Sequence, residues 1–138
     1  MTRVVALAAL ALAGVAAAVD VPAPYAEAVA AADFPKLLSL LNQQFDIPPI
    51  PLGPPDAVYP AVAGEAGAQG TVKLLLYIDD AGAVRDVVIA DSPGWLALEE
   101  AAAKAAKGVR YRPATRDDRP LAVWYVLDMI YYIPAADD

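Results

Sequence analysis

Apolar and polar residues alternate along the C-terminal half of the chain in a way that predicts three strands. Over residues 70–78, every second residue is apolar, which places one apolar face on a strand. That face consists of Val72, Leu74, Leu76 and Ile78. A polar turn around Gly82 follows, and residues 84–90 return as a second strand. The apolar and aromatic run 123–133 predicts a long final strand.

Between the second and third strands the apolar period becomes helical. From residue 95 to 107, apolar residues recur every three or four positions and form a stripe that suits packing on a sheet. The stripe consists of Trp95, Leu98, Ala102, Ala105 and Val109, all expected in the core. Gly108 marks the helix end. The order strand, strand, helix, strand predicts a two-layer α+β domain, with one helix on a three-stranded antiparallel sheet.

The start of the chain has the pattern of a secretory signal peptide. Residues 1–18 combine one positive charge at Arg3, an apolar run and three alanines that suit cleavage after Ala18. The chain is therefore expected to be exported. The alternative is an uncleaved membrane anchor, with the rest of the chain still exported.

Two segments separate this start from the predicted domain. Residues 19–46 predict an N-terminal helix with a break near Asp33, which suits an N-cap before Pro35. Its apolar face consists of Leu37, Leu38, Leu41 and Phe45. Residues 47–56 contain five prolines and favour an extended spacer. The folded domain then takes residues 57–134, and residues 135–138 form a tail.

Composition excludes several classes of function. The chain has no cysteine and no histidine, so the usual zinc sites and histidine-activated or thiol nucleophiles are absent from it. Asp79 and Asp80 lie in the predicted turn without the spacing of a calcium loop. We therefore expect no enzyme, cofactor, metal or small-molecule substrate. The net charge of −7 argues against nucleic acid and anionic membranes as partners.

Over residues 57–133, the ordered set of turn, core and strand residues resembles the C-terminal domain of the TonB family. The matching residues are Tyr59, Pro60, Ala63, Gly67, Gly70, Thr71, Val72, Ile78, Asp79, Gly82, Val84, Val87, Ser92, Gly94, Leu98, Ala101, Ala102, Ala105, Tyr111, Pro113, Ala114, Pro120 and Trp124. The resemblance implies the order β-β-α-β and a periplasmic protein-interaction module. It also implies that the final strand accepts an extended peptide of an outer-membrane receptor, by strand addition. Asp128 stands where the family commonly has a proline.

The final strand and a nearby basic patch form the candidate partner-binding site. The residues expected to line the strand edge are Val123, Trp124, Tyr125, Val126, Leu127 and Asp128. Arg112 and Arg116 either steer an acidic partner segment or only keep an exposed segment soluble. Aromatic residues on a final strand most often serve core or cross-strand packing, and those of this strand would serve binding if the outward-facing set remains uncovered.

Two kinds of partnership follow from such an edge. The resemblance implies a TonB-dependent outer-membrane receptor or another envelope protein as the partner, in transport across the outer membrane. Alternatively, the edge pairs with a second copy, and the chain is a self-associating structural protein of the envelope, such as a homodimer. By the same resemblance, an uncleaved N-terminus would instead make the chain an energy transducer that is anchored in the inner membrane and faces the periplasm.

Overall fold

The computed structural model describes residues 3–4, 20–53 and 66–131. Most of the expected signal peptide, the expected domain start at residue 57 and the tail at 135–138 lie outside the described residues. A short strand β1 (Arg3–Val4) pairs with β2 (Val21–Pro22). Within the described part of the chain, no helix is long and apolar enough to cross a membrane.

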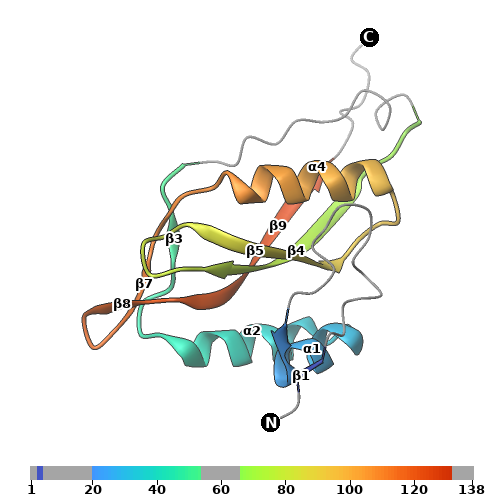
Figure 1. The fold of residues 1–138 in the computed structure, drawn as a ribbon. Helices are drawn as coiled ribbons and strands as arrows, with labels where there is room; N and C mark the ends of the chain where they lie inside the picture. Colours follow the sequence, from blue (N-terminus) through green and yellow to red (C-terminus); the bar gives the residue numbers. More distant parts are fainter. Residues whose placement is uncertain (1–2, 5–19, 54–65, 132–138) are drawn as a thin grey trace.

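The predicted sheet and its helix are present. Strands β4 (Gly70–Ile78), β5 (Val84–Asp91) and β9 (Val123–Tyr131) form an antiparallel sheet in the order β5-β4-β9. Helix α4 (Leu96–Lys107) lies across one face of this sheet (Figure 1). The β-β-α-β order is therefore confirmed.

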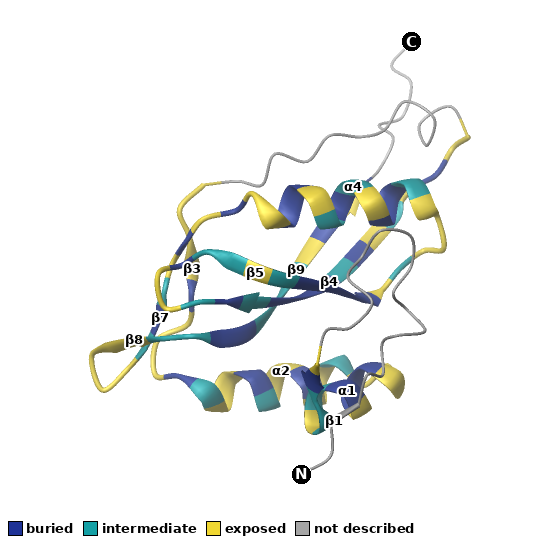
Figure 2. Cartoon of the chain, in the orientation of Figure 1, coloured by how far each residue is buried: buried dark blue, intermediate teal, exposed yellow. Residues whose placement is uncertain are grey.

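The core between α4 and the sheet follows the predicted apolar pattern. All four residues of the predicted face of β4 are fully buried, and the helix side that meets them is buried as well (Figure 2). Trp95 is an exception, because its side chain is 39% exposed. It precedes the first residue of α4 and has an extended backbone, so the helical spacing that predicted its burial does not apply to it.

The N-terminal segment adds a layer on the opposite face of the sheet. It forms α1 (Ala23–Ala30), α2 (Phe34–Leu41) and the 3-10 turn η2 (Asn42–Gln44), and Figure 1 shows α1 and α2 across the sheet from α4. The break falls at Asp33, whose side chain accepts a hydrogen bond from the backbone N–H of Lys36 at 3.2 Å.

The apolar residues of these helices form a second core with the sheet. Leu37 and Leu41 are fully buried and belong to a cluster that also contains Leu75, Val88 and Trp124. Leu38, expected on the same face, is 42% exposed. It follows Leu37 directly, and a step of one residue turns its side chain about 100° away from the buried stripe.

The described part of the proline-rich segment is fixed along the domain. Strand β3 (Ile50–Pro51) pairs antiparallel with β6 (Tyr111–Arg112). The backbone N–H of Leu52 donates to Arg110 O at 2.9 Å. This segment is therefore an attached extended strand and not a free spacer. A hairpin of β7 (Ala114–Arg116) and β8 (Arg119–Leu121) leads into β9.

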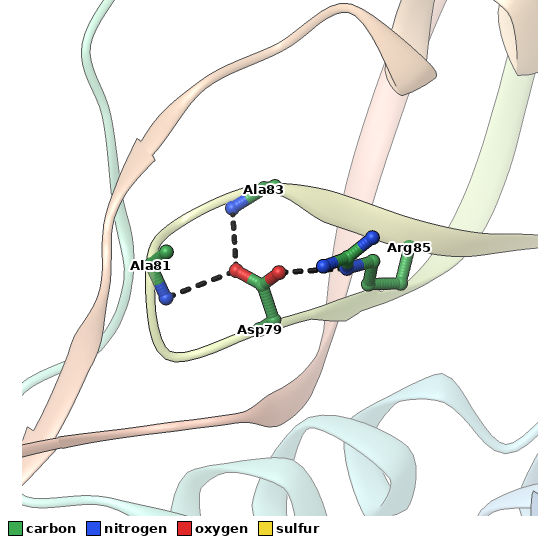
Figure 3. Close-up of polar contacts among 4 residues, drawn as sticks. All are labelled: Asp79, Ala81, Ala83 and Arg85. Atoms are coloured by element: carbon green, nitrogen blue, oxygen red, sulfur yellow. Dashed lines mark hydrogen bonds and ion pairs between the residues drawn. The ribbon is translucent and has the colours of Figure 1, made fainter.

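The turn between β4 and β5 is organised by the carboxylate of Asp79 (Figure 3). Its Oδ1 accepts hydrogen bonds from the N–H of Ala83 at 2.8 Å and of Ala81 at 3.0 Å, and its Oδ2 pairs with Arg85 Nε at 2.7 Å. The bond from Ala83, together with Arg85, holds the pKa of Asp79 below its ordinary value. Asp79 therefore has a structural role in the hairpin. The described residues contain no group of three or more acidic side chains placed to hold a metal ion.

Candidate partner-binding edge

The three-stranded sheet has two edges, and the β5 edge is irregular. The register between β4 and β5 shifts twice, so that Arg85 and Ala90 are extra residues on β5. Such bulges twist an edge and disfavour the addition of another strand. The beginning of β5 is also covered, because Ala83 forms a bridge with Arg110 and the N–H of Tyr111 donates to Gly82 O at 2.9 Å.

The β9 edge is regular along its whole length. Nine residue pairs join β4 and β9 without any shift in register, from Gly70 opposite Tyr131 to Ile78 opposite Val123. In an antiparallel pair, residues alternate between those that hydrogen bond to the neighbour and those whose N–H and C=O point outward. An unshifted register makes this alternation continuous.

The hydrogen bonds of Trp124 show which residues of β9 face outward. Its N–H and C=O both bond to the side chain of Gln44, which lies outside the sheet. The peptide groups of Val126, Asp128 and Ile130 must therefore also point outward. No hydrogen bond from another described residue reaches these three outward groups. We call Val126–Ile130 the open edge.

The structure places the predicted edge residues in different environments. Val123 and Trp124 are buried, and the Trp124 ring packs against Tyr77 with ring centroids 5.0 Å apart. Tyr125, Val126 and Leu127 are half-buried, and Asp128 is exposed. Tyr125 and Leu127 face the α4 layer, whereas Val126 faces the N-terminal helices. The side chains of Val123 and Trp124 thus belong to the core, and of the two only Trp124 has backbone groups that point outward from the edge.

Ile130 on the open edge and Lys73 next to it were not among the predicted site residues. Ile130 is 70% exposed, and it lies on the same strand face as Asp128. Lys73 pairs with Asp128 at 2.8 Å and its Nζ lies 5.2 Å from the ring centroid of Phe34. Continuing the strand alternation past Asp128 would have identified Ile130. Lys73 could be found only once its register with β9 was known.

The two predicted arginines lie apart from each other in the fold. Arg116 ends β7 and its Nη2 donates to Gln43 O at 3.3 Å, which places it beside the residue that precedes Gln44. Arg112 lies on β6, which pairs with β3 and not with β9. Both side chains are exposed. The structure therefore associates Arg116, and not Arg112, with the segment that contacts β9.

A three-stranded antiparallel sheet with one regular edge, covered on one face by a single helix in the order β-β-α-β, defines a small α+β domain with an edge suited to strand pairing. Residues 55–133 match the model of the family described as Gram-negative bacterial TonB protein C-terminal. The chain therefore belongs to the TonB C-terminal family, which confirms the resemblance seen in its sequence.

Two proteins of Pseudomonas aeruginosa are similar to this chain. The protein named tonB2 is 36% identical over 70 residues, which cover 51% of this chain and 26% of that protein. The chain thus matches about a quarter of the length of this relative. The solution NMR structure of the TonB C-terminal domain has a TM-score of 0.52 and 25% identity, covering 67% of this chain and 91% of that one.

Proposed function

We propose that this chain is a non-enzymatic periplasmic protein-interaction module that binds an extended segment of another envelope protein by strand addition at the open edge. TonB family proteins act in the cell envelope and interact with outer-membrane receptors, so such a receptor is the expected source of the segment. The role would then lie in TonB-dependent transport across the outer membrane.

The observation that carries this proposal is the contrast between the two sheet edges. Along the open edge, every second residue points its N–H and C=O outward, which gives three such residues in an unshifted register, whereas β5 has two bulges. Only a regular edge offers an added strand the even spacing of hydrogen bonds that it needs. The β9 edge is thus the favoured site.

Backbone pairing alone gives a weak complex. Six main-chain hydrogen bonds at about 1 kcal/mol each contribute roughly 6 kcal/mol, which is of the order of the entropy cost of association. Side chains next to the edge must therefore add to the affinity. Leu127 on the α4 side and Ile130 on the other side are the apolar candidates, because both keep accessible surface.

Charge argues against a second copy as the main partner. The antiparallel pairing of two β9 strands that uses all three outward residues places Asp128 opposite Asp128 and Val126 opposite Ile130. Like charges directly opposite each other destabilise a strand pair. The negative net charge, −7 over the full sequence, adds to this repulsion. A segment without an acidic residue at that position fits the edge better.

The proposed location depends on the first residues of the chain. We propose export with cleavage after Ala18, on the sequence pattern of residues 1–18. The intact mass of the protein purified from the envelope fraction is expected to match a chain that starts at Val19. A mass that includes residue 1, found in the membrane fraction, would favour the anchored energy transducer instead.

Capture from an envelope extract tests the proposed binding. Immobilised wild-type chain is exposed to a detergent-solubilised outer-membrane fraction and compared with Ile130→Lys, which adds a charge at the open edge. We expect captured receptor to fall about tenfold, as for loss of an interface hot spot. The matched control is Leu52→Lys, because Leu52 is similarly exposed at 64% but lies on the segment beside β6. Equal capture by both variants would contradict the proposal.

A further inference from the structure

The side chain of Gln44 occupies a position on the β9 edge that a neighbouring strand would otherwise take. Trp124 N–H donates to Gln44 Oε1 at 2.9 Å, and Gln44 Nε2 donates to Trp124 O at 2.7 Å. A residue of an added strand would satisfy the same two groups with its own C=O and N–H. The carboxamide of Gln44 therefore reproduces one residue of a paired strand.

Buried residues before and after Gln44 in the sequence hold this contact in place. Gln44 Nε2 also donates to Leu41 O at 2.8 Å, so its second N–H is used within the turn. Leu41 before it is fully buried, and Phe45 after it is buried with its ring 5.9 Å from that of Tyr125. A partner strand that displaced Gln44 would have to break three hydrogen bonds at a preorganised site.

We infer that Gln44 closes one end of the β9 edge and thereby restricts an added strand to the part of β9 from Val126 onward. The inference rests on the proposed function and specifies where on β9 the partner binds. Within the part of β9 that the structure describes, three outward residues remain beyond Gln44, and the five residues Val126–Ile130 span about 17 Å. The end of the partner segment is aligned next to Gln44, which sets its register.

The fixed register assigns neighbours to the side chains of the partner segment. On the face of α1 and α2, the segment passes Val126, Asp128 and Ile130, in that order from Gln44. Asp128 is already paired with Lys73, so this position offers both a negative and a positive group. The segment that fits is apolar at its end beside Ile130 and polar opposite Asp128.

Amide hydrogen exchange on the purified chain, followed by NMR, tests whether Gln44 closes the edge. In the wild type, the Trp124 amide is expected to exchange at least about tenfold more slowly than the outward amides of the open edge, because among these amides only that of Trp124 has a hydrogen-bond partner in the described part of the chain. Gln44→Ala should remove this difference. The control Gln43→Ala should retain it, because the Gln43 contact to Arg116 uses the backbone carbonyl.

A second variant keeps the exchange test informative if Gln44→Ala does not fold. Gln44→Glu retains an acceptor for Trp124 N–H but lacks the donor for Trp124 O, and an intermediate exchange rate is expected. The inference would be overturned by a wild-type Trp124 amide that exchanges as fast as those of the open edge. Protection that persists in Gln44→Ala would overturn it as well.

Capture from the outer-membrane fraction separates this inference from the proposed function. Because the partner binds beyond Gln44, the Gln44→Ala chain should capture at least as much receptor as the wild type. A fall of about tenfold, with Gln43→Ala unaffected, would place Gln44 in the partner contact and overturn the inference. If the wild type captures no receptor, the proposed function fails, whereas the exchange rates still decide whether Gln44 closes the edge.

Discussion

Leu127→Pro is expected to unfold the domain, whereas Asp128→Pro is expected to leave it folded. Leu127 pairs with Leu74, and the outward orientation of Trp124 places the Leu127 N–H in the bond to β4. Proline at this position removes that bond inside the sheet, and the apolar side chain is lost as well. We expect a loss of more than about 3 kcal/mol in unfolding free energy, a large part of the stability of a small domain.

Asp128→Pro tests, at the next residue, which backbone N–H groups of β9 point away from β4. The N–H of Asp128 points outward, where proline is tolerated in edge strands. The variant also loses the exposed pair with Lys73, which is worth little. A loss below about 2 kcal/mol is expected from urea denaturation. Leu127→Ala and Asp128→Ala separate side-chain from backbone effects. If both proline variants lost the same stability, the assignment of outward residues would be wrong.

Gly82→Ala is expected to destabilise the β4-β5 hairpin severely. Gly82 has a φ of +88°, and a Cβ atom there would lie 1.8 Å from the carbonyl oxygen of Tyr111. This oxygen belongs to the backbone, and it cannot move away easily because the N–H of Tyr111 donates to Gly82 O at 2.9 Å. Steric overlap therefore adds to the conformational strain. We expect a loss of more than about 3 kcal/mol in unfolding free energy.

Gly94 provides a matched control for the strain alone. Its φ is +96°, and a Cβ atom there would meet no atom within 4 Å. Gly94→Ala should therefore cost only the left-handed backbone conformation, about 1–2 kcal/mol. Urea denaturation of the two variants gives the difference between them. Equal losses would show that the close approach of Tyr111 to Gly82 does not contribute.

The sequence was sufficient for the α+β core because its apolar periods are local. The alternation in β4 and the stripe in α4 each require only neighbouring residues, and both predict the residues that are buried. Asp33 as the start of a helix is a signal of the same kind. Trp95 was misplaced because the spacing does not show at which residue a helix begins.

The packing of α1 and α2 on the sheet, and the contact of Gln44 with β9, depend on residues that are distant in the sequence. Gln44 and Trp124 are 80 positions apart, and no spacing rule connects them. The prolines of residues 47–53 indicate an extended backbone but not its pairing with β6. Trp124 was a candidate for both core and binding, and only its burial in the second core and its packing on Tyr77 identify it as core.

Site-specific crosslinking tests the central claim, that the partner binds at β9, most directly. The chain has no cysteine, so a single introduced cysteine carries a benzophenone probe at one known position. Ile130→Cys marks the open edge, and Arg85→Cys marks the bulged β5 edge. After illumination with the solubilised outer-membrane fraction, the probe at residue 130 is expected to crosslink to a receptor segment and the probe at residue 85 is not. Crosslinks from residue 85 alone would contradict the account.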